Sequence, residues 1–367
     1  MNKLIVIGPK SGNKGGTTVS FNYLLEELDR AGVSYFCIDT NRESGIRKVY
    51  SSFLHLFLFL KLIRSNCIIS LHASNTRAAV YALILSIFAQ ITDSLLIIRV
   101  FGGNHVNYIS DTNKLIRQLV IKCYRKHTLL LQTKGLIKSL TEEYGINNAV
   151  WFPTSRPQTS TKNITSFNRN GTLMLSYIGG ISESKGIYNL LMVARNIHQY
   201  HLNIKISLYG ELYDKKFLNL INEYNIQDIL IYKGVLEPVD VCPVMLHSDM
   251  LLFPSTYPGE GYPGVIIEAI NANLPILATD HQYISELIRQ NIDGILYDKN
   301  NPEKLWDNLL TIYHNREKLL FFHKNLATKK EKFYSEYWNG SYFLKIINKE
   351  HTDIGKVVSN NSAKDKH

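Results

Sequence analysis

Cysteine is scarce in this sequence. The four cysteines, Cys37, Cys67, Cys123 and Cys242, lie far apart and form no C-x-x-C pair. This spacing excludes a zinc-finger pattern and gives no sign of a disulfide framework. We therefore expect small buried thiols and a reducing compartment.

Long hydrophobic runs are also missing. The apolar part of the N-terminal MNKLIVIG is too short for a signal peptide, and no stretch reaches the length of a membrane span. We therefore expect a cytoplasmic protein, either free or peripherally bound. The apolar stretch VYSSFLHLFLFLKLI at 49–63 predicts a buried helix of an α/β layer. The alternative is that one of its faces, flanked by Lys48, Lys61 and Arg64, lies on an anionic lipid surface.

Acidic residues are outnumbered by basic ones. Lys and Arg total 41 against 31 Asp and Glu, which gives a formal charge of +10 and a pI of about 9.2. This surplus favours an anionic partner such as nucleic acid, an acidic lipid surface or a phosphorylated substrate. The basic residues are scattered and form no arginine-rich arm, which disfavours nucleic acid. A hydrophobic content of 45% in 367 residues is typical of a globular protein with two domains.

Two common nucleotide-binding fingerprints are absent. The loop GPKSGNKGG at 8–16 follows an apolar strand, but Lys14 precedes Gly15 instead of Ser or Thr, so it is not a P-loop. It also lacks G-x-G-x-x-G, so a nicotinamide dinucleotide site is not supported. What remains is either a simple turn or a loop whose backbone at Gly15 and Gly16 can approach a ligand closely.

Strands and helices alternate along the chain, which predicts an α/β fold of two doubly wound parallel sheets. In the first half we expect strands at 4–8, 35–39, 67–72, 95–101, 128–132 and 149–152, and helices at 17–32, 49–63, 77–90, 111–125 and 135–144. After a polar linker at 153–171 we expect strands at 173–178, 203–209, 229–233, 250–253 and 275–278, and helices at 186–199, 214–224, 240–247, 264–272, 281–290, 302–315 and 316–335. The expected domains are 1–160 and 161–335, with a helix at 336–348 as a candidate to return to the first domain and a disordered tail at 349–367.

The most informative stretch is DMLLFPSTYPGEGYPGVIIE at 249–268. An apolar strand, a loop rich in Pro and Gly, and a helix follow one another, which is the geometry that aims backbone N–H groups at an anion. Glu260 lies in the loop, and we place Glu268 in the first turn of the helix. Two acids would repel a bare phosphate, so they indicate a larger ligand with hydroxyl groups, such as a sugar nucleotide.

Two further residues follow predicted strands. Lys185 follows a strand and Gly179-Gly180 at a second helix start, where a cation favours a phosphate partner over a purely solvated role. His72 ends a strand before Ala-Ser-Asn, and we weigh a functional role equally against a structural one.

These motifs resemble glycosyltransferase family 4. Glu260 and Glu268 have seven residues between them, and the stretch resembles the family signature, while YIGGISESKG resembles its phosphate-contacting segment. Weaker likeness extends from the first strand to about residue 335. The resemblance implies a retaining enzyme of the GT-B architecture, with two Rossmann-like domains facing across a cleft. It implies Glu260, His72 and Lys185 as catalytic residues, and a donor site of Glu268, Gly15, Gly16, Gly261, Tyr262, Pro263, Gly264, Gly180, Gly210 and Arg99.

The sequence departs from the family pattern at two places. Gly180 stands where many members have an arginine, which Arg99 or Lys14 could replace. Phe101 stands where many have a histidine, whose role would fall to His72 or His105 if it is kept. No Asp-x-Asp motif is present at the site, so we expect Lys185 to neutralise the diphosphate without a metal or other cofactor.

The sequence therefore predicts a transferase that moves a sugar from a nucleoside diphosphate donor to a glycan or lipid-linked acceptor. By association we place it in bacterial surface polysaccharide synthesis, as for lipopolysaccharide O-antigen or capsule, with an anionic membrane surface as a candidate partner and no nucleic acid. The alternatives are a sugar-nucleotide epimerase of the same architecture and a non-catalytic partner-binding scaffold. A P-loop ATPase is a more distant alternative.

Overall fold

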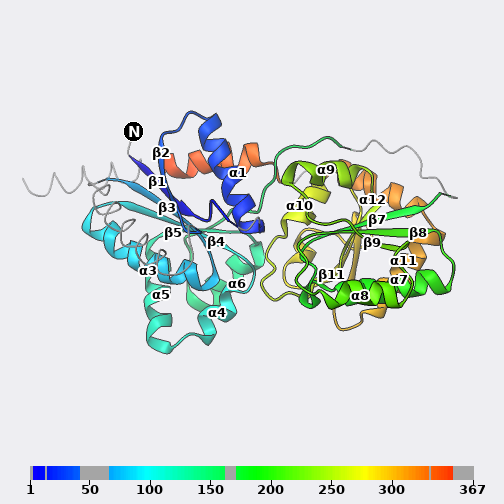
Figure 1. Ribbon diagram of the computed structural model, residues 1–367. Helices are drawn as coiled ribbons and strands as arrows, with labels where there is room; N and C mark the ends of the chain where they lie inside the picture. Colours follow the sequence, from blue (N-terminus) through cyan, green and yellow to red (C-terminus); the bar gives the residue numbers. More distant parts are fainter. Residues whose placement is uncertain (1–2, 13–14, 42–65, 162–170, 330–331, 350–367) are drawn as a thin grey trace, which may run out of the picture. The chain divides into compact units, whose positions relative to one another are not determined.

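The computed structural model describes residues 3–12, 15–41, 66–161, 171–329 and 332–349. The predicted helix at 49–63, Lys14 and the tail from residue 350 lie outside these ranges. The chain divides into two compact units: the first combines the residues up to Pro157 with those from Tyr334 onward, and the second is Gln158–Phe333. Each unit is built on a six-stranded sheet in which the paired strands run parallel (Figure 1). The α/β class expected from the alternation is confirmed.

The first unit has the strand order β2-β1-β3-β4-β5-β6. Its strands are β1 (Leu4–Gly8), β2 (Tyr35–Asp39), β3 (Ile68–Ser74), β4 (Leu95–Phe101), β5 (Thr128–Leu131) and β6 (Ala149–Trp151). Within the described ranges its helices are α1 (Gly16–Arg30), α3 (Asn75–Ile91), α4 (His105–Asp111), α5 (Lys114–Lys126), α6 (Lys134–Tyr144) and the π-helix η3 (Glu336–Tyr342). Because β2 and β3 lie on opposite sides of β1, right-handed crossovers put α1 on one face of the sheet and α3 and α5 on the other.

The core of the first unit forms where apolar helix faces cover the sheet. Phe21, Leu24 and Leu28 recur on one side of α1 and are fully buried against β1 and its neighbours. The segment that follows η3 belongs to the same cluster, because Phe343 is fully buried there and Ile346 nearly so. The C-terminal segment expected at 336–348 thus packs in the first unit.

The second unit has the strand order β12-β11-β10-β7-β8-β9. Its strands are β7 (Leu173–Ile178), β8 (Ile204–Tyr209), β9 (Leu230–Tyr232), β10 (Met250–Phe253), β11 (Ile276–Asp280) and β12 (Gly294–Asp298). Its helices are η1 (Glu183–Lys185), α7 (Ile187–Gln199), α8 (Lys216–Glu223), α9 (Pro238–Leu246), α10 (Gly264–Asn271), η2 (Ile284–Glu286), α11 (Glu303–His314) and α12 (Glu317–Ala327).

Three elements of the second unit differ from expectation. The helix expected at 316–335 ends at Ala327. The helix predicted at 281–290 is wrong: Gln282 and Asn291 have positive φ angles of 54° and 58°, and only the short η2 forms between them. Ile284, Leu287 and Ile288 are apolar at helical spacing, but these residues are buried in the core without forming one continuous helix. The edge strand β12 was not predicted.

Candidate functional site

The predicted motif occupies the centre of the second sheet. β10 is fully buried, ends at Phe253, and leads through a loop into α10. From β7 the chain runs outward through β8 to β9, and it then returns to β10 on the other side of β7. The direction of connection therefore reverses between β7 and β10, and this reversal is where ligands bind in open α/β sheets.

The loops that follow β7 and β10 are locked together. The backbone N–H of Thr256 donates to the carbonyl oxygen of Ser184 at 2.9 Å. Gly186, with a φ of +76°, packs so tightly that a Cβ at this position would lie 2.1 Å from the carbonyl oxygen of Pro254. Only glycine allows both the backbone angle and the close approach. This contact fixes Lys185 beside the loop that carries Glu260.

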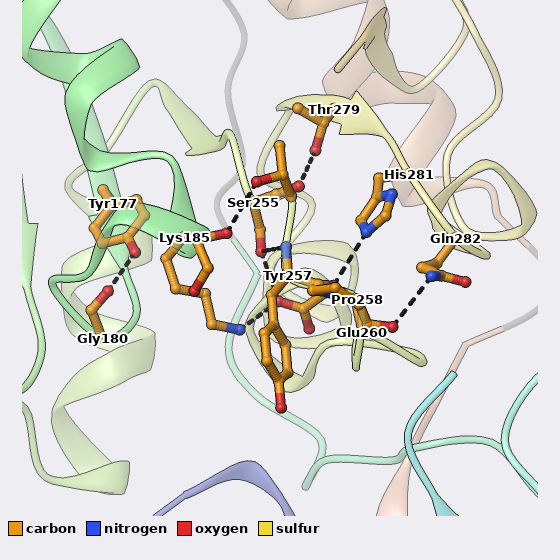
Figure 2. Close-up of polar contacts among 12 residues, drawn as sticks. Tyr177, Gly180, Lys185, Ser255, Tyr257, Pro258, Glu260, Thr279, His281 and Gln282 are labelled. Carbon is orange, nitrogen blue, oxygen red and sulfur yellow. Dashed lines mark hydrogen bonds and ion pairs between the residues drawn. The ribbon is translucent and has the colours of Figure 1, made fainter. Parts of the chain in front are cut away.

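Lys185 and Glu260 form an ion pair at the sheet centre (Figure 2). The Glu260 carboxylate also accepts a hydrogen bond from Ser255 Oγ at 2.8 Å. The Lys185 ammonium lies 4.5 Å from the centre of the Tyr257 ring, whose face attracts a cation. The Lys185 side chain keeps 27% of its surface exposed, so an anion in solution can reach it.

The end of β11 supports this loop from the other side. Thr279 Oγ1 donates to the carbonyl oxygen of Ser255 at 2.5 Å, and Gln282 Nε2 donates to that of Pro258 at 3.1 Å. His281 Nε2 lies 3.1 Å from the carbonyl oxygen of Tyr257, and because a carbonyl only accepts, this nitrogen carries the proton. Burial, together with the charge of Lys299, lowers the pKa of His281. The imidazole is therefore a neutral support at pH 7.

Sequence reasoning did not single out this supporting layer. Ser255 lies within the quoted motif, Thr279 lies near the end of the next strand, β11, and His281 follows that strand. The signal that could have found them is their place at the carboxyl ends of adjacent parallel strands, which meet at one edge.

Glu268 lies on α10, but one turn later than expected. The helix begins at Gly264, so Glu268 is in its second turn, and it is half-buried. The first N–H groups of the helix lack intrahelical acceptors and can bind an anion. Pro263 is the N-cap residue, and Tyr262 is buried and donates through its hydroxyl to Glu286 at 2.6 Å.

Gly180 and Gly210 shape the edge beside β7. Gly210 has a φ of +146°, and a Cβ there would lie 1.8 Å from the carbonyl oxygen of Gly179. A Cβ at Gly180 would lie 2.9 Å from the ring of Tyr213, which occupies space beside the position of the family arginine. Packing within this unit therefore requires glycine at position 210, whereas a Cβ at position 180 would need only the ring of the exposed Tyr213 to move.

The first glycine-rich loop is fixed by Asp39 at the end of β2. The carboxylate accepts backbone N–H groups of Lys10 at 2.9 Å and of Ser11 at 3.1 Å. Burial raises the pKa of Asp39, but the hydrogen bonds from the Ser11 hydroxyl and from the N–H groups of Asn41, Lys10 and Ser11 together hold it below the usual value. Gly15 is the N-cap of α1, with an ordinary φ of −64°. Both Gly15 and Gly16 are exposed, and a Cβ at either would meet no atom within 4 Å. Neither the backbone angle nor packing within the described structure requires these two glycines.

His72 and Arg99 lie inside the first unit, although the sequence placed them among site residues. His72 is fully buried next to the rings of Phe21 and Phe343, and its Nε2 is 2.8 Å from Ser70 Oγ. Burial and the charge of Arg99 lower its pKa well below the usual value. We therefore correct His72 to a core histidine.

Arg99 is also enclosed. Its guanidinium lies between the rings of Phe101 and Phe152, at 4.7 and 4.5 Å, and reaches Asn339 Oδ1 at 3.4 Å. Burial, with the charge of Arg156, lowers its pKa to about 9, so it remains charged at pH 7. Arg99 is therefore corrected from a donor-binding residue to one that ties the C-terminal segment to the sheet.

His105, the other candidate for the family histidine, is buried too. Its Nε2 is 2.9 Å from the hydroxyl of Tyr124 on α5. The structure thus brings together Lys185, Glu260, Gly261 and the start of α10 within the second unit, while both histidine candidates lie in the core of the first.

The second unit also matches a family of known sequences. The profile of the family described as "Glycosyl transferases group 1" matches residues 160–329. The match covers 170 of the 367 residues, a little under half of the chain. It confirms the resemblance drawn from the glutamate motif, which lies within the matched residues.

Individual relatives align with only part of their length. An uncharacterized glycosyltransferase of Methanocaldococcus jannaschii is 28% identical over 141 residues, which cover 38% of this chain and 38% of that protein. WcaL of Escherichia coli, a glycosyltransferase named for colanic acid biosynthesis, is 23% identical over 133 residues, or 35% of this chain and 33% of that protein. The chain therefore aligns with well under two thirds of either relative.

Solved structures match over nearly the whole chain. HepE of Anabaena, solved with UDP and glucose, gives a TM-score of 0.72 at 12% identity, covering 94% of this chain and 99% of that one. The lipopolysaccharide outer core galactosyltransferase WaaB gives 0.66 at 15% identity, covering 95% and 99%. Together with the group 1 profile match, these likenesses show the GT-B fold.

Proposed function

We propose that this protein is a retaining glycosyltransferase that uses a nucleoside diphosphate sugar as its donor. The observation that carries the proposal is the Lys185–Glu260 pair at the point where the sheet connection reverses, beside the start of α10. A cation and free helix N–H groups suit a diphosphate, and an adjacent carboxylate suits a sugar hydroxyl.

The proposed reaction gives one task to each of three residues of the second unit, Lys185, Glu260 and Glu268. The bond between the anomeric carbon and the donor phosphate breaks, and the acceptor oxygen bonds to that carbon on the same face. The acceptor proton passes to the leaving phosphate. Lys185 stabilises the charge that develops on the diphosphate, a task that other transferases give to a metal. Glu260 contacts the transferred sugar, and Glu268 accepts hydrogen bonds from the ribose.

We further propose a glycan or lipid-linked acceptor in bacterial surface polysaccharide synthesis, at the cytoplasmic side of the membrane. The basic charge of +10 supports an anionic surface, and the names of WcaL and WaaB point in the same direction. None of the helices in the described ranges combines the length and low charge needed to span a membrane. The exposed Gly15–Gly16 backbone supports a ligand contact from the first unit.

A screen of sugar nucleotides by thermal shift tests the donor. We expect one nucleoside diphosphate sugar to stabilise the protein, and Lys185→Met to weaken that shift strongly. Lys205→Met is the matched control, because Lys205 is an exposed lysine of the same unit on β8. Glu268→Ala should weaken donor binding by roughly 1–3 kcal/mol, since it leaves ribose hydroxyls unpaired.

Product analysis then separates the possible reactions. Transfer with retained anomeric configuration, measured by NMR and undiminished by EDTA, is the expected result. If the donor alone is converted to an epimer, the protein is an epimerase and not a transferase. Magnesium-dependent ATP hydrolysis would instead indicate an ATPase. Absence of any stabilising sugar nucleotide would contradict the proposal.

A further inference from the structure

The outer surface of α3 is apolar although it is exposed. Its inner side carries small buried residues, Ala78, Ala82 and Ala89 among them, which let the helix lie close to the sheet. Its outer side carries a stripe at helical spacing, formed by Val80, Ile84, Ile87 and Ile91. Ile87 is 60% exposed and Ile91 is 75% exposed. A surface helix of a globular protein usually has polar residues on its outer face.

α5 packs beside α3 and also has exposed apolar residues. The two helices are joined side by side, because Cys123 Sγ donates to the carbonyl oxygen of Ala82 at 3.5 Å and Ser86 Oγ lies 2.7 Å from His127 Nε2. While Val120, Cys123 and Tyr124 of α5 are buried, Leu115, Ile116 and Leu119 are exposed. We call the exposed apolar residues of α3 and α5 the α3–α5 surface.

The charged residues of α3 and α5 are all basic, although Arg117 and Arg125 donate to the carbonyl oxygens of Ser110 in α4 and Tyr144 in α6. α5 contains Lys114, Arg117, Lys122, Arg125 and Lys126 and no acidic residue, and α3 contains Arg77 and no acidic residue. The nearest acids along the chain, Asp93 and Asp111, lie just beyond the ends of the two helices. Exposed apolar side chains with basic side chains around them match an anionic bilayer: the apolar side chains can contact the acyl chains, and the basic side chains can contact the negative headgroups.

We propose that the α3–α5 surface docks the protein onto an anionic lipid bilayer. The isoleucines and leucines enter the headgroup boundary, and the lysines and arginines contact the lipid phosphates. A second copy of the chain fits the same surface less well, because a two-fold contact would place the cations of one α5 opposite those of the other. The inference extends the proposed membrane location, but its test needs neither donor nor acceptor, so either can fail without the other.

Sedimentation with vesicles tests this surface. We expect the wild type to bind vesicles of phosphatidylcholine with about one third phosphatidylglycerol, and to bind phosphatidylcholine vesicles or high-salt samples much less. The double variants Ile87→Asn/Ile91→Asn on α3 and Lys122→Gln/Lys126→Gln on α5 should each lower the partition coefficient roughly tenfold. Their exposed positions should leave the thermal midpoint unchanged.

Controls in the second unit match each change. Val235→Asn/Val239→Asn replaces exposed apolar residues, Lys215→Gln/Lys216→Gln replaces exposed lysines, and both should retain binding. Wild type that stays in the supernatant, or binding that neither test variant lowers, would overturn the proposal. Light scattering that shows a dimer lost on Ile87→Asn/Ile91→Asn, with vesicle binding unchanged, would assign the surface to a second copy.

Discussion

At the scale of single residues, Lys185 and Glu260 neutralise each other, so a diphosphate that binds Lys185 must compete with Glu260. Glu260→Gln removes this competitor, while its amide oxygen can still accept from Ser255. We expect the affinity for UDP or GDP alone to rise about two- to tenfold, as for a partly exposed ion pair, and sugar transfer to fall sharply. Calorimetry and a transfer assay measure the two effects.

The control for this variant is Glu223→Gln, at an exposed position of α8. It should change neither quantity. Nucleotide affinity that falls in Glu260→Gln would show that the carboxylate supports the nucleotide directly instead of opposing it.

A second residue-scale prediction concerns Arg99, which the structure encloses between two aromatic rings. Arg99→Met removes the hydrogen bonds to Asn339 Oδ1 and to the carbonyl oxygen of Pro153, so we expect the unfolding free energy to fall by roughly 1–3 kcal/mol. We expect the folded variant to keep its donor affinity within twofold. Loss of donor affinity in a folded Arg99→Met protein would return Arg99 to the site.

At the scale of elements, two glycines that the sequence predicted to bind the donor differ in whether the fold can accommodate a side chain at their positions. Gly210→Ala places a Cβ against the carbonyl oxygen of Gly179, so we expect a loss of roughly 2–4 kcal/mol in unfolding free energy. Gly16→Ala, at the first position of α1, should stabilise by up to about 1 kcal/mol. Urea unfolding measures both, and equal effects would contradict this distinction.

The sequence correctly predicted those elements whose apolar pattern and length both indicate the same type of element, strand or helix. β1 and β10 were found because a parallel strand buried on both faces is a continuous apolar run. The helix at 281–290 failed because burial of Ile284 and Leu287 imitates helical spacing, while a positive φ at Gln282 interrupts the backbone.

The candidate site was also predicted only in part, because some of its features are visible in the sequence and others are not. Glu260, Lys185 and the start of α10 lie in glycine-bearing loops after strands, which a sequence can show. His72 also ends an apolar run, but the direction of its side chain, toward Phe21, depends on which face of the sheet α1 covers. Spacing along one strand does not contain that information.

At the scale of the whole molecule, buried histidines should make stability depend on pH. Burial lowers the pKa of His105 to about 4, and burial with the charge of Lys126 lowers that of His127 to about 4. Because the unfolded value is about 6.5, the folded protein binds fewer protons, and stability is lost as the pH falls from about 6.5 toward 4. His105 alone should account for roughly 2–3 kcal/mol at pH 4.

Fluorescence can follow this loss in the first unit. Trp306 lies in the second unit, so Trp306→Phe leaves Trp151 and Trp338, both in the first. In that background, His105→Gln should flatten the fall in urea midpoint between pH 6.5 and 4.5. An unchanged slope would show that His105 does not control acid sensitivity.

The central claim is that the second unit holds an activated sugar by its nucleotide end. A crystal structure with the sugar nucleotide found by thermal shift tests it most directly. We predict the diphosphate against Lys185 and the start of α10, the ribose on Glu268, and the sugar beside Glu260. A nucleotide bound elsewhere, with the Lys185–Glu260 pair intact, would contradict the account.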